Sequence, residues 1–479
     1  MTKTVAVVGA GTMGAGIAQV AAGAGHRVLV YDAVPGAAAT GIGKIRERVA
    51  RRGQDPAALD LTEVPALEDL ADAQIVIEAI VEDLAVKRAL YEGLELMVPG
   101  TTILATNSSS LSPTAIAAGL QHPERIVGLH FFNPAPAMKL VEVIAGLATD
   151  PAVADAAAEL ATSWGKTVVR ASPTPGFIVN RIARPFYGEA WRLYEEGAAD
   201  PATIDAVLTG AGGFRMGPFA LMDLIGHDVN EAVTRSVWSA SGYDPRYTPS
   251  LAQRALTDAG WFGRKTGRGV YDYRDSVVSP ATPPAAVPAA PIAASPAAPT
   301  TPTWAAAAVT LIGGTLVLPS TGRTATELAA AHGAPVIVTD RAFDETNATA
   351  VALAASPATG PEALAQATAM FQAAGRDVYV IDDVPGLIVT RTVAMLVNAG
   401  YDALQHRVAS AADIDTAMRL GTNYPAGPLE WGDRWGLPVV LDILDALHQA
   451  EGDPRYRAST LLRRRASELD EMLRALTDM

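Results

Sequence analysis

The chain has 479 residues, of which 49% are hydrophobic and 18% charged, and this composition excludes a wholly disordered protein. Its 37 basic and 51 acidic residues give a formal net charge of −14, whereas nucleic-acid-binding surfaces need an excess of basic charge. The absence of cysteine excludes disulfides and thiolate metal ligands. No apolar run is long enough to span a membrane, and the first residues lead into a strand rather than a signal peptide. We therefore expect a cytoplasmic protein without nucleic-acid or membrane partners.

The first part of the chain alternates between strand-like and helix-like patterns. Short apolar runs at 4–8, 28–31, 75–79 and 102–105 are separated by stretches of helical periodicity, of which 16–24 is the first. This alternation predicts a doubly wound α/β domain with a parallel sheet. Beyond Pro175 the patterns at 177–196 and 201–209 are helical with no strand between them, which predicts an all-α domain.

Residues 279–303 contain eight prolines, nine alanines and no charged residue, a composition typical of a semi-extended linker. Beyond it the chain repeats itself at an offset of 210 residues. Residues 175–226 and 385–436 share 13 identities in 52 positions without a gap, which indicates a duplicated helical unit. Between the linker and this repeat, strand-like runs at 309–312, 336–338 and 378–381 occur without a glycine-rich motif, so we expect a degenerate remnant of the sheet domain.

These patterns predict five segments. They are an α/β domain at 1–180, a helical domain at 181–278, the linker at 279–303, the sheet remnant at 304–384 and a second helical domain at 385–479.

A GxGxxG motif, Gly9-Ala10-Gly11-Thr12-Met13-Gly14, lies between the first strand and the first helix. In such a motif the first glycine permits a tight turn, the second lets a pyrophosphate approach the backbone, and the third lets the helix pack on the strand. Asp32 follows at the end of the second strand, where a carboxylate accepts hydrogen bonds from a ribose 2′-hydroxyl and repels a 2′-phosphate. The motif therefore predicts that the cofactor is NAD rather than NADP.

His130 and Glu142 lie in two β-branched runs on either side of Asn133-Pro134-Ala135-Pro136. If these runs form a hairpin centred near Pro136, the two residues face each other as a cross-strand pair. A carboxylate that holds one imidazole nitrogen fixes the tautomer and favours the imidazolium. The pair therefore predicts a general base.

Several motifs together resemble the L-3-hydroxyacyl-CoA dehydrogenase family. They are GAGTMG, IEAIVEDLAVK (77–87), ATNSSSLS (105–112), GLHFFNPAPAMKLVEVI (128–144), PGFIVNR (175–181) and GRKTGRGVYDY (263–273). The two-copy layout is similar to the long bacterial members that oxidise 3-hydroxyadipyl-CoA or 3-hydroxybutyryl-CoA in phenylacetate breakdown. The resemblance implies an NAD-dependent enzyme with an acyl-CoA substrate and no metal. It also implies that 1–180 is an NAD-binding Rossmann-type domain and 181–278 a helical substrate or dimerisation domain. Helical domains pair across a dimer in single-copy members, so we expect either a homodimer or an intrachain pseudo-dimer in which the second helical domain is the partner.

The resemblance also implies roles for individual residues. His130 takes the proton of the substrate 3-hydroxyl, Glu142 orients His130, and Ser109 and Asn180 bind the reacting oxygen. Glu82, Lys87, Asn133 and Lys265 surround the cofactor in this reading. Without the family, Ser109 would be read as a polar cap near a helix start, and Glu82, Lys87 and Lys265 as surface charges.

The helix after Asp32 carries Lys44, Arg48, Arg51 and Arg52 on one face, which we interpret either as a seat for coenzyme A phosphates or as a solvated helix face. In the second half, Asp340, Ala352 and Thr390 stand where His130, Glu142 and Asn180 stand in the first, so that half is expected to be inactive.

Two alternative functions stay open. One is a dehydrogenase of the same family that acts on a hydroxy acid without coenzyme A, and the other is a non-catalytic NAD-binding protein.

Overall fold

The computed structural model describes residues 2–274 and 310–477, so the expected linker at 279–303 lies outside the described residues. The chain divides into two compact units. The first consists of residues 1–181 together with 406–422, and the second of 182–405 together with 423–479. None of the helices that the structure describes could serve as a membrane span.

The first unit is built on an eight-stranded sheet with the order β3-β2-β1-β4-β5-β6-β7-β8. Strands β1 to β6 are parallel, β7 runs antiparallel to β6, and β8 is parallel to β7. The strands are β1 (Thr4–Val8), β2 (Arg27–Tyr31), β3 (Leu61–Glu63), β4 (Ile75–Glu78), β5 (Ile103–Thr106), β6 (Ile126–Phe131), β7 (Leu140–Ala145) and β8 (Thr167–Ala171). This is the doubly wound sheet that the alternating sequence pattern predicted.

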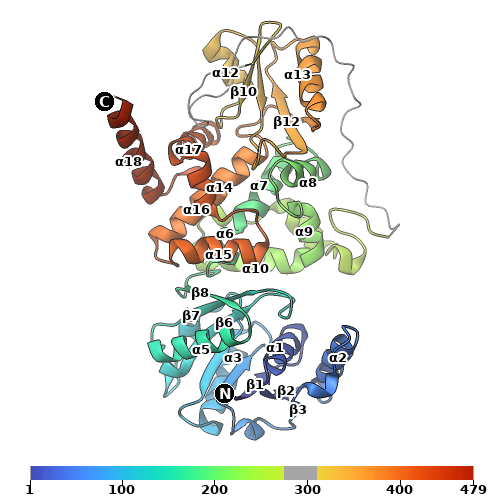
Figure 1. Ribbon diagram of the computed structural model, residues 1–479, viewed down its shortest axis with the longest axis vertical. Helices are drawn as coiled ribbons and strands as arrows, with labels where there is room; N and C mark the ends of the chain where they lie inside the picture. The colour runs from blue at the N-terminus through green and yellow to red at the C-terminus, as the bar shows by residue number, and fades with distance from the viewer. Residues whose placement is uncertain (1, 275–309, 478–479) are drawn as a thin grey trace. The chain divides into compact units, whose positions relative to one another are not determined.

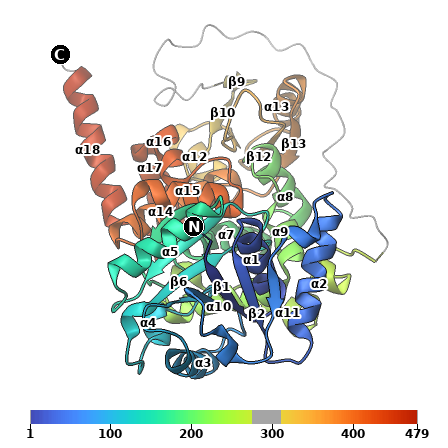
Figure 2. The ribbon, with the colours of Figure 1, turned by 60° about the horizontal axis from the view of Figure 1, so that its bottom comes forward.

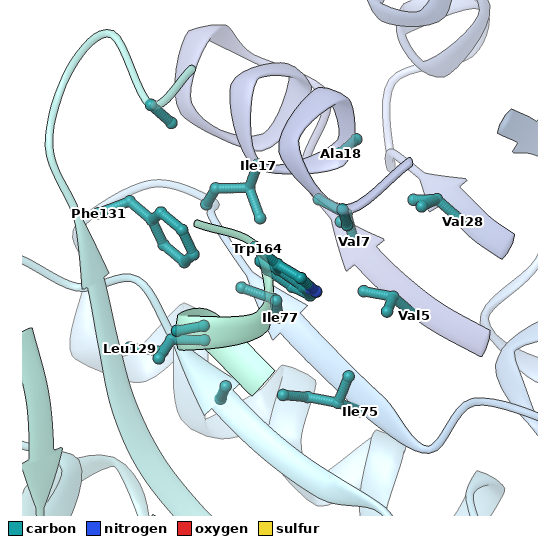
Figure 3. Close-up of a cluster of buried hydrophobic side chains, with 14 of the residues drawn as sticks. Val5, Val7, Ile17, Ala18, Val28, Ile75, Ile77, Leu129, Phe131 and Trp164 are labelled. Carbon is teal, nitrogen blue, oxygen red and sulfur yellow. The ribbon is translucent and has the colours of Figure 1, made fainter. Parts of the chain in front are cut away.

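Helices cover both faces of this sheet (Figures 1 and 2). On one face, α1, α2 and α5 pack on a core that includes Val5, Val7, Ile17 and Ile77 (Figure 3). On the other face, α3 and α4 cover a second apolar cluster. The helices are α1 (Thr12–Gly23), α2 (Ala37–Ala50), α3 (Leu84–Met97), α4 (Pro113–Ile116) and α5 (Pro151–Ser163).

The first unit also contains a helix from the second half of the chain, α15 (Ala411–Thr422), which packs on β7 and β8. The segment before this helix is tied to the end of β8, because the Ser172 amide donates to the Val408 carbonyl at 2.7 Å. The Ser172 hydroxyl donates to the Arg407 carbonyl, also at 2.7 Å. A helix that lies more than 200 positions away in the sequence is thus part of the sheet domain.

The second unit contains most of the helices of both repeats. After α6 (Val179–Ile182), which spans the boundary between the units, the helices are α7 (Arg184–Glu195), α8 (Pro201–Gly210), α9 (Pro218–Ile225), α10 (His227–Ala240), α11 (Leu251–Asp258), α14 (Val389–Gln405), α16 (Pro428–Trp435), α17 (Leu437–Glu451) and α18 (Thr460–Thr477). Equivalent helices α7 and α14 pack together, and the buried Arg391 of α14 pairs with Glu189 of α7 at 2.8 Å. Single 3₁₀ turns lie in the first unit at Pro56–Ala58, Leu67–Leu70 and Pro123–Arg125, and in the second at Pro245–Tyr247, Arg264–Thr266 and Pro454–Tyr456.

A second, five-stranded sheet in this unit has the order β13-β12-β11-β10-β9. Its elements are β9 (Thr310–Ile312), β10 (Thr315–Pro319), α12 (Ala325–His332), β11 (Val336–Thr339), β12 (Ala350–Ala355), α13 (Pro361–Ala373) and β13 (Asp377–Val380). The pattern of parallel, antiparallel and parallel pairs from β10 to β13 repeats that from β5 to β8. The second sheet therefore corresponds to the later half of the first, and the described residues hold no counterpart of β1 to β4 in it.

The packing of helix on sheet is reciprocal between the repeats. Helix α8, which corresponds to α15 at the 210-residue offset, packs on β12 of the second sheet. The Asp382 amide donates to the Ala198 carbonyl at 3.1 Å, which matches the Ser172–Val408 bond 210 residues away. Each repeat therefore places one helix against the sheet of the other repeat.

Several predicted boundaries were wrong. Helix α1 begins at Thr12 rather than at residue 16, because Gly14 and Gly16 lie inside its buried face. The stretch 177–196 is broken at Ala183, before Pro185, which lacks an amide hydrogen. Arg51 and Arg52 follow the end of α2 at Ala50 and are not on the helix. Strands β3, β8, β10 and β12 were not predicted, and the Ala-rich β12 has a weak strand signal.

Candidate active site

His130 and Glu142 face each other across the β6–β7 hairpin as the sequence predicted. The His130 Nδ1 and Glu142 Oε2 atoms are 2.6 Å apart, and the two residues are 5% and 0% exposed. The other carboxylate oxygen, Oε1, accepts the amides of Ile178 and Val179 at 3.0 Å each, at the start of α6. The buried carboxylate is thus held from two sides, and it fixes the orientation of the imidazole.

Ser109 lies in the loop after β5, at the carboxyl edge of the parallel strands, where open α/β sheets bind ligands. Asn180 belongs to α6, and its Nδ2 donates to the Ser109 carbonyl at 3.4 Å. This contact brings together two residues that are 71 positions apart in the sequence. The cap that was the alternative reading of Ser109 is provided by Ser112, whose side chain accepts the amide of Thr114.

One carboxylate oxygen of Glu82 accepts hydrogen bonds from the serine loop, which consists of Ser108, Ser109 and Ser110. Its Oε1 accepts the Ser108 hydroxyl at 2.6 Å and the amides of Ser109 and Ser110 at 2.9 Å each. Burial acts to raise the pKa of Glu82, but the hydrogen bonds from Ser108 and Ser110 and the charge of Lys87 outweigh it, so the pKa lies below its ordinary value. The loop that carries Ser109 is therefore organised around an ionised carboxylate.

Lys87 is 1% exposed, so it is a buried cation rather than a solvated helix charge. Its Nζ lies 2.5 Å from Glu78 Oε1 and 3.4 Å from Glu82 Oε2. Glu78, at the end of β4, also accepts the Thr106 hydroxyl at 2.8 Å and is fully buried. The sequence reading missed Glu78, although a carboxylate in the apolar run Ile75–Glu78 was a usable signal.

The glycine turn can accommodate a dinucleotide. A Cβ at Gly9 would lie 2.6 Å from the Ala79 carbonyl oxygen, and one at Gly14 would lie 1.7 Å from the Gly9 carbonyl oxygen, so neither site tolerates a side chain. A Cβ at Gly11 would instead meet no atom within 4 Å, so the backbone there is open to a ligand. No side chain caps the start of α1 at Thr12 and Met13, which leaves the positive end of the helix for an anion.

Asp32 lies just past β2 and contacts the glycine turn directly. Its Oδ2 accepts the Ala10 amide at 2.7 Å, and its Oδ1 accepts the Val34 amide at 2.9 Å. The carboxylate is therefore fixed beside the turn, which fits its expected contact with a ribose.

Asn133 follows β6 in the segment that connects His130 to β7. Lys265 belongs to the second unit, where its Nζ forms an ion pair with Asp228 at 2.6 Å.

Helix α2 carries two of the expected basic side chains. Lys44 is exposed, whereas Arg48 donates to Gln19 Oε1 at 2.7 Å. Ile42, Ile45 and Val49 form the buried face of the helix, as expected.

Three family models match the chain. The NAD-binding domain of 3-hydroxyacyl-CoA dehydrogenase matches residues 4–174, and the C-terminal domain of that enzyme matches 176–273 and again 386–472. The reduced Rossmann-fold domain of 3-hydroxybutyryl-CoA dehydrogenase matches 317–385.

Known proteins are similar to the whole chain or to its first part. The 3-hydroxyadipyl-CoA dehydrogenase of Escherichia coli K12 is 46% identical over 97% of both chains. A crystal structure of 3-hydroxybutyryl-CoA dehydrogenase from E. coli K12 is also 46% identical, covers 97% of this chain and 98% of its own, and superposes with a TM-score of 0.91. A shorter structure, (S)-3-hydroxybutyryl-CoA dehydrogenase from Ralstonia eutropha, is 37% identical with a TM-score of 0.55 and covers 57% of this chain and 99% of its own. The chain therefore belongs to the 3-hydroxyacyl-CoA dehydrogenase family of NAD-dependent oxidoreductases.

Proposed function

We propose that His130 is the general base of this NAD-dependent 3-hydroxyacyl-CoA dehydrogenase. The observation that carries the proposal is the 2.6 Å contact between His130 Nδ1 and the buried carboxylate of Glu142. With Nδ1 engaged, the other ring nitrogen, Nε2, takes the proton from the substrate 3-hydroxyl. The negative charge of Glu142 stabilises the imidazolium that forms.

Ser109 and Asn180 hold the reacting oxygen beside His130. A hydroxyl and a side-chain amide are suitable donors to an oxygen that gains negative character as its proton leaves. The carboxylate of Glu82 and the cation of Lys87 keep the Ser109 loop in place, and Glu78 holds Lys87 from the side of the sheet.

The glycine turn of residues 9–14 and Asp32 would hold NAD, with Glu82, Lys87, Asn133 and Lys265 as further cofactor contacts. Bound NAD supplies a hydride acceptor for the substrate C3. The open backbone at Gly11 and the uncapped start of α1 suit its pyrophosphate, and the fixed carboxylate of Asp32 suits the ribose of NAD and repels a 2′-phosphate.

We assign 3-hydroxyadipyl-CoA as the substrate, with 3-hydroxybutyryl-CoA as the second choice. The first is supported by the name of the E. coli relative that matches 97% of the chain, and the second by the description of the similar crystal structure. Lys44 and Arg48, with Arg51 and Arg52 in the turn after α2, would attract the coenzyme A phosphates.

The second half of the chain serves as an intrachain partner rather than as a second catalyst. The mutual packing of α7 and α14 and the exchange of α8 and α15 support a pseudo-dimer, while Asp340 and Ala352 replace the catalytic pair. In this division 1–180 binds the cofactor, 181–278 and 385–479 are the paired helical domains, and 304–384 is the sheet remnant. A cytoplasmic location suits a chain without cysteine.

The test compares kcat/KM for 3-hydroxyadipyl-CoA and 3-hydroxybutyryl-CoA, with the reaction rate measured from the absorbance of NADH. His130→Gln should lower turnover on the better substrate by about 10²–10⁴-fold while NAD still binds. A folded His130→Gln variant with unchanged turnover would refute the assignment of the base. A higher kcat/KM for 3-hydroxybutyryl-CoA would make that compound, and not 3-hydroxyadipyl-CoA, the assigned substrate.

A further inference from the structure

Helix α15 comes from the half of the chain that lacks the catalytic pair, but it packs on the strand that carries Glu142. It lies against β7 and β8 within the first unit. The second half therefore contributes to the catalytic unit at a point close to its catalytic carboxylate.

The contact depends on Gly421, in the last turn of α15. A Cβ at this position would lie 2.9 Å from Leu140 Cδ2 and 2.9 Å from Val179 Cγ2, so the helix approaches as closely as a glycine permits. Leu140 is the first residue of β7, two positions before Glu142. Val179 is the first residue of α6, and its amide is one of the two that Glu142 Oε1 accepts.

The side chains that touch Gly421 thus belong to the residues that determine where Glu142 lies. One oxygen of Glu142 is held by the amides of Ile178 and Val179, and the other holds the imidazole of His130. A displacement of Val179 moves the first oxygen, and because the carboxylate is rigid, it moves the second oxygen as well.

We propose that α15, acting through Gly421, is a positioning element for the His130–Glu142 pair, so that the second repeat completes the catalytic domain of the first. Gly421 contacts no reacting atom and acts only through Val179 and Leu140. This inference rests on the proposed role of His130 as the general base.

The chain contains a matched control for this contact. At the end of α8, Gly210 packs on the second sheet in the reciprocal arrangement, and a Cβ there would lie 2.7 Å from the Ala350 Cβ and 2.9 Å from Thr349 Oγ1. The second sheet carries Ala352 in place of Glu142. Gly210 therefore reproduces the packing constraint at a place where no catalytic pair depends on it.

The experiment compares Gly421→Leu with Gly210→Leu in the full chain. Leucine favours helix, so both variants test packing against a sheet and not helix propensity. Both should lower the melting temperature. Gly421→Leu should also lower kcat by about ten- to hundredfold with KM for NAD and acyl-CoA within about twofold, because small displacements of catalytic groups are costly. Gly210→Leu should leave kcat unchanged. Gly421→Ala provides a smaller step if the leucine variant does not fold.

A double-mutant cycle tests whether the effect of Gly421→Leu on kcat depends on Glu142. In a Glu142→Ala background, Gly421→Leu should change kcat by less than about twofold, because the side chain it displaces is already removed. Additive losses, or equal kcat values for Gly421→Leu and Gly210→Leu, would overturn the proposal. If His130→Gln keeps its turnover, the assignment of the base fails instead, so the two failures are distinguishable.

Discussion

Glu142 and Asp340 bind equivalent backbone amides from different strand positions. Glu142, on β7, accepts the amides of Ile178 and Val179, and Asp340, just after β11, accepts those of Ile388 and Val389 at 2.9 and 2.6 Å. At the 210-residue offset the amides correspond, but Asp340 stands in the place of His130. The second half has a carboxylate at the helix start but no imidazole beside it, so the carboxylate holds the helix start in both halves.

Replacing Glu142 with Gln should affect both catalysis and stability. Turnover should fall by about 10- to 10³-fold, because the imidazolium loses its counter-charge and its orientation. The melting temperature should also fall, because the amide nitrogen of Gln donates and cannot accept at the position it occupies. Turnover and thermal unfolding measured on the same preparation check this, with NAD affinity as the control. An unchanged turnover would contradict it.

Replacing Asp340 with Ala should affect stability alone. The change leaves the buried amides of Ile388, Val389 and Thr390 without their acceptor, which should lower the free energy of unfolding by roughly 2 kcal/mol or more. Turnover per folded chain should stay within about twofold of the parent, because Asp340 does not position any of the proposed catalytic side chains. Urea unfolding and active-site titration measure the two quantities. A loss of turnover as large as that of Glu142→Gln would show that the second half takes part in catalysis.

Replacing Asp32 with Ala should weaken the preference for NAD over NADP. The variant loses the acceptor for the ribose hydroxyls and the charge that repels a 2′-phosphate. We expect KM for NAD to rise by about tenfold and the ratio of kcat/KM between NAD and NADP to fall. Steady-state rates with both cofactors measure this change. A variant that retains the parental ratio would place the discrimination elsewhere.

Glu82 makes the stability of the serine loop depend on pH. Because its pKa is lowered in the folded protein, the ionised carboxylate stabilises the fold above its unfolded pKa, and this contribution is lost as pH falls through the folded value. The difference in unfolding free energy between the parent and Glu82→Gln should therefore be largest at neutral pH. It should shrink below about pH 4. Urea unfolding at about pH 7 and about pH 3 tests this prediction, and a difference that grows on acidification would contradict it.

The sequence alone was sufficient to predict those features that depend on neighbouring residues along the chain or on a regular repeat. The GxGxxG turn, the alternation of strand and helix, and the 210-residue repeat are of this kind. The pairing of His130 with Glu142 was also accessible, because antiparallel strands joined by a short turn align residues at equal distances from the turn. The Ala-rich strand β12 was missed by its composition, although its offset from β7 would have located it.

Long-range placement was decided only by the tertiary structure. Lys87 has the sequence context of a solvated helix charge, yet it is buried between Glu78 and Glu82, because the end of β4 and the start of α3 enclose it. Helix α15 has an ordinary amphipathic pattern that does not specify which sheet it covers. The sequence by itself determined the glycine motif and the facing of His130 and Glu142, because both depend on residues that are close together along the chain. The tertiary structure decided which distant segments surround them, because an apolar face specifies that it must be buried but not against which partner.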